Sequence, residues 1–156
     1  MDLFVVRHAA TSSGRAGVPK AERALSNRGR EDAATLARGL ARLGVRLDRL
    51  VHSPWRRAVE TAEALTLLLD GETFVDADLL RGPSPALLTR LEGRRVAVVG
   101  HRPGLGQLVS MLVLGGPDHG ERFSIKRGGV VWLRGKAEPG GMTLRAELPP
   151  RVLQAL

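Results

Sequence analysis

Two short, uninterrupted apolar runs place the tightest limits on how this chain can fold. Leu3–Val6 and Val96–Val99 contain only apolar residues, so neither run has a polar face. Such runs are typical of strands that are buried on both faces of a parallel sheet. Leu50–His52 reads as a third strand. Because parallel strands need long crossover connections, helices are expected between them.

The segment after the first run has the periodicity of an amphipathic helix. From Arg28 to Leu43, apolar residues recur three and four positions apart. Ser26 is expected to cap the start of this helix, because its hydroxyl can accept a free backbone N–H. Gly44 is expected to end it.

Two further segments are predicted to be helical. An apolar stripe runs from Trp55 to Leu69, with Ser53 as the expected N-cap and Pro54 in the first helical position. A third helix is expected from about Pro103 to Leu114.

The C-terminal third is expected to add a hairpin at one edge of the sheet. Val130–Leu133 and Met142–Arg145 are strand-like and are separated by a turn at Glu138–Gly141. Alternating strands and helices predict an α/β fold. We therefore expect a single domain over residues 1–156, with three layers: a mostly parallel central sheet and helices on both faces.

Composition excludes several classes of protein. The 156 residues include no cysteine, which rules out disulfides, thiolate metal sites and cysteine nucleophiles. No apolar run approaches the ~18 residues of a membrane span, and the N-terminus does not read as a signal peptide. The absence of cysteine fits a cytoplasmic protein best. The net charge of +8 is explained either by solubility with loose attraction to polyanions or, more specifically, by an anionic substrate. Nucleic acid is not expected as a partner, because the arginines are dispersed and aromatic residues make up 3%.

A histidine or an arginine follows each of the three predicted strands. Ligands of open α/β sheets bind beyond the carboxyl ends of the strands. The junctions there are Arg7–His8, Ser53–Arg57 and Gly100–Gly104. Arginine donates bidentate hydrogen bonds to phosphate, and a neutral imidazole can attack phosphorus. Each residue has a structural alternative, such as a pair between Arg57 and Glu60, but together they predict a phosphoryl site without a metal or other cofactor.

Other catalytic motifs are absent from the sequence. Gly104-Leu105-Gly106 lacks the third glycine of a dinucleotide fingerprint, because Val109 stands there. The sequence has no phosphate-binding Gly-Lys-Ser/Thr, no Gly-x-Ser-x-Gly and no His-Glu-x-x-His. His52 is expected to be structural and His119 to lie in a loop.

Four segments of the sequence form a set of motifs. They are Leu3–Ala9 (an Arg-His-Gly signature with Ala9 for glycine), Arg23–Gly29 (with Ala24 for proline), Ser53–Ala62 (Ser-Pro-x-x-Arg-Ala-x-x-Thr-Ala) and Val98–Leu105 (Gly-His-Asn-Pro-Gly-Leu with Arg102 for asparagine). Together they resemble the histidine phosphatase superfamily, and its short SixA-like branch in particular. The resemblance covers residues 2–133 and implies a phosphoglycerate-mutase-like fold.

The resemblance also implies roles for individual residues. His8 would be the phosphorylated nucleophile, and Arg7, Arg57 and His101 would complete the catalytic, phosphate-binding pocket. The motif selects Arg57 over Arg56, whereas spacing alone would not choose between them. The general acid is open, with candidates Glu22, in a predicted flexible loop over residues 11–24, and Asp78.

The expected function is that of a phosphohydrolase, most simply a phosphohistidine phosphatase of SixA type. Its partner would be a phosphohistidine-bearing protein or a phosphorylated small molecule. The alternatives are a phosphomonoesterase for a sugar or nucleoside-type phosphate, and a non-catalytic anion-binding module. The sequence does not indicate the physiological substrate or the oligomeric state.

Overall fold

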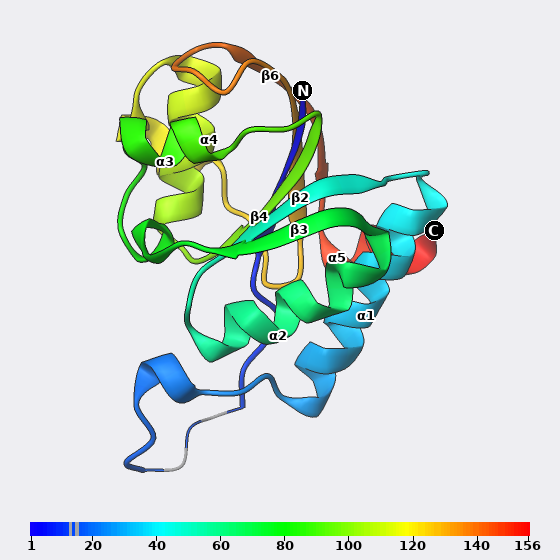
Figure 1. The fold of residues 1–156 in the computed structure, drawn as a ribbon. Coiled ribbons are helices and arrows are strands. Elements are labelled where there is room, and N and C mark those ends of the chain that lie inside the picture. Colours follow the sequence, from blue (N-terminus) through cyan, green and yellow to red (C-terminus); the bar gives the residue numbers. More distant parts are fainter. Residues whose placement is uncertain (13, 15) are drawn as a thin grey trace.

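The strand after the N-terminus occupies a central position in a six-stranded sheet. The computed structural model describes residues 1–12, 14 and 16–156. The strand order is β3-β2-β4-β1-β5-β6 (Figure 1), with β1 parallel to β4 and antiparallel to β5. The strands are β1 Asp2–Arg7, β2 Leu47–His52, β3 Leu69–Val75, β4 Arg95–Gly100, β5 Val130–Gly135 and β6 Met142–Leu148.

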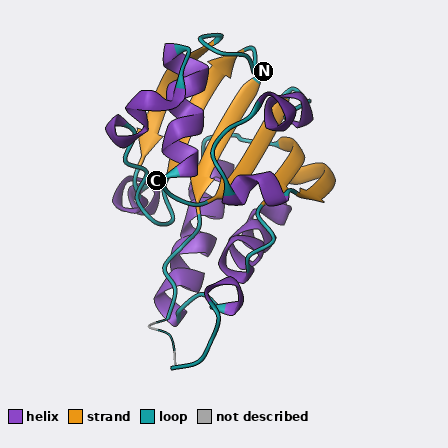
Figure 2. Cartoon of the chain, turned by 90° about the vertical axis from the view of Figure 1, so that its left-hand side faces the viewer, coloured by secondary structure: helices purple, strands orange, loops and turns teal. Residues whose placement is uncertain are grey.

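Helices cover both faces of this sheet, which confirms the predicted three-layer α/β fold (Figures 1 and 2). Leu3 and Val5 of β1 pack into one core with α3 and α4, whereas Phe4 and Val6 pack into the other with α1, α2 and α5. Alternate side chains of a strand point to opposite faces, so a wholly apolar strand fills both cores. The helices are α1 Asn27–Arg42, α2 Arg56–Leu65, α3 Pro85–Arg90, α4 Gly104–Leu114 and α5 Pro150–Ala155, with 3-10 turns η1 Lys20–Glu22, η2 Thr66–Leu68, η3 Ala77–Leu80 and η4 Pro117–Arg122.

The first helix begins and ends as its sequence predicts. The Ser26 hydroxyl accepts a hydrogen bond of 2.9 Å from the backbone N–H of Gly29. Gly44 follows the helix with a φ of +75°, a left-handed conformation that glycine adopts without steric cost.

The second predicted helix is wrong at both ends. It begins at Arg56, and none of the described side chains caps it, so Ser53 is not its N-cap. The helix ends at Leu65, and after one 3-10 turn the chain enters β3 at Leu69. The apolar stripe does continue, since Leu68 is buried, but pairing with β2 gives the backbone from Leu69 onward a different set of hydrogen bonds.

The remaining elements are a mixture of confirmed and unpredicted ones. α4 begins one residue after Pro103 and ends at Leu114, as expected, and the C-terminal hairpin is present as β5 and β6. α3 and α5 were not predicted, because each is too short to show a helical period. Among the described residues, every helix is too short or too polar to cross a lipid bilayer.

Candidate active site

The register of the sheet brings the three strand ends together. Arg7 lies opposite Gly100, and His52 lies opposite Val99, so the residues that follow these strands emerge side by side. The imidazole rings of His8 and His101 have centroids 5.2 Å apart. Two histidines that are distant in sequence therefore share one site, as the predicted junctions require.

His8 is held in the form that a nucleophile needs. Its side chain is buried, and its Nδ1 lies 2.7 Å from the backbone carbonyl of Ala9. A carbonyl only accepts, so Nδ1 carries the proton and Nε2 keeps a free lone pair. Burial, aided by the positive charges of Arg57 and Arg7, lowers the pKa of His8 to about 4. The ring is thus neutral near pH 7.

His101 is oriented by a buried hydroxyl. Its Nε2 lies 2.6 Å from the Oγ of Ser53, which is fully buried and also accepts a hydrogen bond from the backbone N–H of Trp55. Ser53, predicted as a helix cap, is instead a positioning residue for His101. Burial, followed by the neighbouring His8 and arginines, lowers the pKa of His101 to about 3.

The two neighbouring arginines of α2 point to different places. Arg57 lies with its guanidinium carbon 4.5 Å from the Trp55 ring centroid and donates to the backbone carbonyl of Lys20 at 2.8 Å. Arg56 instead pairs with Glu60 across 3.3 Å at the surface. The structure therefore places Arg57, and not Arg56, beside the two histidines, in the register that the motif implies.

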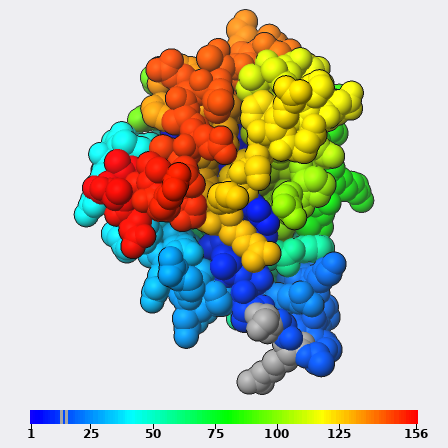
Figure 3. All heavy atoms as spheres, turned by 180° about the vertical axis from the view of Figure 1, so that it is seen from behind, coloured from blue at the N-terminus to red at the C-terminus, as the bar shows by residue number. Residues whose placement is uncertain are grey.

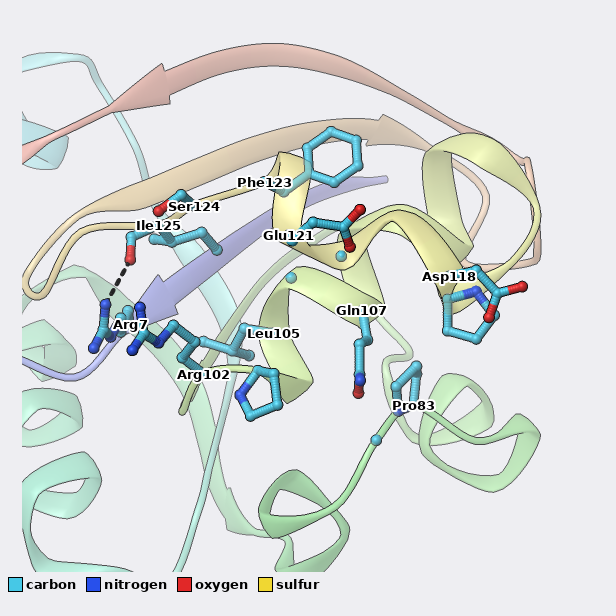
Figure 4. A pocket seen from close by; sticks show the side chains of 15 residues that line it. Arg7, Pro83, Arg102, Leu105, Gln107, Asp118, Glu121, Phe123, Ser124 and Ile125 are labelled. Carbon is cyan, nitrogen blue, oxygen red and sulfur yellow. Dashed lines mark hydrogen bonds between the residues drawn. The ribbon is translucent and has the colours of Figure 1, made fainter.

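Arg7 enters the site from the end of β1. Its Nη1 donates to the carbonyl of Ile125 at 3.1 Å, in the segment that precedes β5 (Figure 4). Burial lowers the pKa of Arg7 from its usual value, and the charges of Arg102 and Arg127 lower it further. These neighbours show that positive charge is concentrated here; arginine nevertheless stays protonated.

Two residues behind the site hold its parts in place. The Thr61 hydroxyl is fully buried, accepts from the backbone N–H of Ala9 at 3.0 Å and donates to the carbonyl of Arg57 at 2.7 Å. It thereby ties the loop after His8 to α2. At Gly29, a Cβ would lie 1.9 Å from the carbonyl oxygen of Ala10, so only glycine allows α1 to approach this loop.

The site is a hollow of about 400 Å³ with a strongly cationic wall. Its lining residues are Arg7, His8, Thr11, Lys20, Arg23, Trp55, Arg57, Leu80, His101, Arg102 and Arg127. None of these described residues is a carboxylate. All four predicted pocket residues are present.

Sequence reasoning missed several of the cations in this wall, notably Lys20 and Arg127. Arg127 belongs to the segment before β5, where the Gly128 N–H donates to the His8 carbonyl at 3.2 Å. Figure 3 shows this segment, near residue 125 on the colour bar, reaching the dark blue chain that follows β1. The sequence signal for this close approach of the two chain segments is the pair of glycines, Gly128 and Gly129, that follows Arg127.

The two candidate general acids do not line the hollow. Asp78 forms ion pairs with Arg90 and Arg81, and Glu22 lies in η1. The general acid therefore stays a hypothesis. Of the predicted flexible loop, Ser13 and Arg15 lie outside the described residues, and its flexibility stays a prediction. Among the residues that the structure describes, no three His, Asp or Glu side chains gather as a metal ligand set.

A second, larger cleft of about 690 Å³ adjoins this hollow and shares Arg7 and Arg102 with it. In Figure 4, these two arginines lie at one end, and Gln107, Asp118 and Pro83 lie toward the other. Leu105, Phe123 and Ile125 also line the cleft, which is therefore partly apolar.

Comparison with known proteins identifies the family. Residues 3–80, half of the chain, match the family model of the histidine phosphatase superfamily (branch 1), and the chain belongs to that family. The mitochondrial serine/threonine-protein phosphatase PGAM5 of Rattus norvegicus is 36% identical over 83 residues. That match spans 53% of this chain and 28% of the relative, so the chain corresponds to well under two thirds of that protein.

Solved structures share the fold over nearly the whole chain. The protein histidine phosphatase SixA complexed with tungstate has a TM-score of 0.81 at 23% identity, covering 98% of this chain and 99% of that one. The α-ribazole phosphatase from Shigella flexneri has a TM-score of 0.74 at 18% identity, covering 96% and 97%. At these identities the likeness establishes the fold. The two proteins act on different substrates by name, so the substrate class stays open.

Proposed function

We propose that this chain is a phosphohydrolase that works through a covalent phosphohistidine on His8. The observation that carries the proposal is a neutral His8, with Nδ1 committed to the Ala9 carbonyl, in a hollow lined by arginines. The Nε2 lone pair attacks phosphorus, and the bond to the leaving group breaks with its electrons on the leaving atom. Water then attacks the phosphohistidine, which releases inorganic phosphate and restores neutral His8.

The surrounding side chains stabilise the transferring phosphoryl group. Arg7 and Arg57 offer donors to its equatorial oxygens, where negative charge builds up in the transition state. His101 Nδ1 is buried and has no hydrogen-bond partner among the described residues. We propose that the Ser53 hydroxyl donates to Nε2 and that Nδ1 carries a proton, which it donates to the same phosphoryl group. The charge of the site is supplied by side chains, so we propose a metal-independent reaction.

The preferred substrate is a phosphohistidine, as in proteins of SixA type. Among the described residues, no carboxylate lines the hollow and could protonate a departing oxygen. An alkoxide is a poor leaving group without a general acid, whereas the imidazole nitrogen of a phosphohistidine is readily protonated. The chemistry of the wall thus favours a P–N bond over an alkyl ester, on a phosphohistidine-bearing protein in the cytoplasm.

The adjoining cleft favours a second candidate, a small-molecule phosphomonoesterase. A volume of about 690 Å³ lies within the range of small-molecule pockets. Its partly apolar lining would accept the organic part of a sugar or nucleoside-type phosphate whose phosphoryl group lies on Arg7.

Substrate comparison with and without a chelator tests both the mechanism and the substrate class. We expect phosphoramidate and phosphohistidine to be hydrolysed faster than a sugar phosphate, with equal rates in the presence of chelator. His8→Ala should abolish turnover of all of them. Turnover that survives His8→Ala would contradict the nucleophile assignment, and binding of phosphate without turnover would identify an anion-binding module.

A further inference from the structure

The wall of the hollow carries more positive charge than one phosphoryl group can neutralise. Six lining residues are cationic: Arg7, Lys20, Arg23, Arg57, Arg102 and Arg127. A phosphoryl dianion supplies about two negative charges. Among the described residues, no aspartate or glutamate forms an ion pair with any of these six side chains. Positive charge on the wall therefore remains unneutralised after the transferring phosphoryl group is bound.

Four of the six cations lie beyond the pair, Arg7 and Arg57, that the transferring phosphoryl group uses, and two of these four are Arg102 and Arg127. Arg102 stands where the family motif has asparagine, and its guanidinium lies beside that of Arg7 at the mouth of the larger cleft (Figure 4). Arg127 lies close enough to lower the pKa of Arg7, His8 and Arg57. Both are in position to bind an anionic group next to the phosphoryl group under attack.

The chemistry of the leaving group points the same way. Without a carboxylate in the wall, only a leaving group that is stable as an anion, or one that is easily protonated, can depart rapidly. A phosphate or pyrophosphate is such an anion, and it carries the negative charge that Arg102 and Arg127 would bind. A phosphoanhydride satisfies both requirements at once.

We propose that the site also hydrolyses phosphoanhydrides, taking the terminal phosphoryl group of a short polyphosphate, with Arg102 and Arg127 binding the penultimate phosphate. This inference rests on the phosphohistidine mechanism proposed above. The His8 Nε2 attacks the terminal phosphorus, and the bridging P–O bond breaks with its electrons on the shortened polyphosphate. Water then hydrolyses the phosphohistidine. The sum is one water consumed, one inorganic phosphate released and a polyphosphate shorter by one unit.

The test compares tripolyphosphate with p-nitrophenyl phosphate in the presence of chelator. Both have leaving groups that depart without a general acid, but only tripolyphosphate places an anion on Arg102. We expect kcat/KM for tripolyphosphate to exceed that for p-nitrophenyl phosphate by at least about tenfold, the effect of one charge-assisted hydrogen bond. Arg102→Asn, which restores the family residue, should remove most of this ratio, and Arg127→Gln should reduce it.

A matched control separates specific binding from overall charge. Arg151→Gln removes an exposed arginine of α5 and should leave the ratio unchanged. A ratio near one in the wild type, or an equal loss in Arg151→Gln and Arg102→Asn, would overturn the proposal while leaving the phosphohistidine mechanism intact. Failure of the mechanism itself would show differently, as turnover of p-nitrophenyl phosphate that survives His8→Ala.

Discussion

Replacing Arg57 or its neighbour Arg56 by alanine should have very different effects on catalysis. The Arg57 guanidinium lies against Trp55 within the hollow, where it can donate to a phosphoryl oxygen. Removing one preorganised donor to a developing charge costs about 3 kcal/mol, or roughly 100-fold in kcat. Arg56 makes an exposed i,i+4 pair with Glu60, worth about 0.3–0.5 kcal/mol of stability. Because Arg56 does not line the hollow, Arg56→Ala removes no donor to the phosphoryl group and should change kcat by less than about threefold.

Steady-state kinetics on p-nitrophenyl phosphate, with the melting temperature of each variant measured alongside, provide the assay. Arg57 also donates to the Lys20 carbonyl, so Arg57→Lys is needed as a variant that keeps the charge but not the planar donor pair. We expect Arg57→Lys to retain more activity than Arg57→Ala. Equal losses in Arg56→Ala and Arg57→Ala, at equal melting temperatures, would refute the assignment of Arg57 to the phosphate pocket.

Three further predictions concern the pH response and the support of the site. Because the pKa of His8 is lowered to about 4, His8 stays neutral below pH 6, and kcat/KM should fall only as the pH falls through about 4. A fall of kcat/KM near pH 6.5 would contradict the lowering of the His8 pKa by burial. Thr61→Val leaves the Ala9 N–H unpaired and should lower the free energy of unfolding by about 1–3 kcal/mol in urea titration; no loss would mean that water replaces the hydroxyl. Gly29→Ala forces a Cβ against the Ala10 carbonyl and should lower the free energy of unfolding by about 1–3 kcal/mol. Gly44→Asn, at an open position that tolerates asparagine, should lower it less. Equal losses in the two variants would refute the role of the close contact at Gly29.

The fold was predictable where burial leaves a clear pattern. The apolar runs at Leu3–Val6 and Val96–Val99 are central strands because only a sheet covered on both faces can bury them completely. β3 lies at the edge and is largely exposed, so its residues carry no such pattern. Its start at Leu69 is set by pairing with β2, which no local periodicity records.

The part of the site that follows the buried strands could be predicted from the sequence, whereas the contacts made by loops could not. The position of His8 beside His101 follows from the rule that parallel strands end at one edge, and the distance between them bears it out. Ser53 looked like a helix cap because the preference of serine for caps is local, whereas its contact with His101 joins the ends of the neighbouring strands β2 and β4. Arg127 could not be placed, because it reaches the hollow through a loop whose path depends on tertiary packing.

The most direct test of the account is to trap the phosphorylated enzyme. After rapid mixing with substrate and quenching at alkaline pH, mass spectrometry of peptides should find one phosphohistidine, on His8, formed at least as fast as steady-state turnover. The phosphopeptide should be absent from His8→Ala. Full turnover with no phosphohistidine, or with phosphate on His101 instead, would contradict the assignment of His8 as the nucleophile.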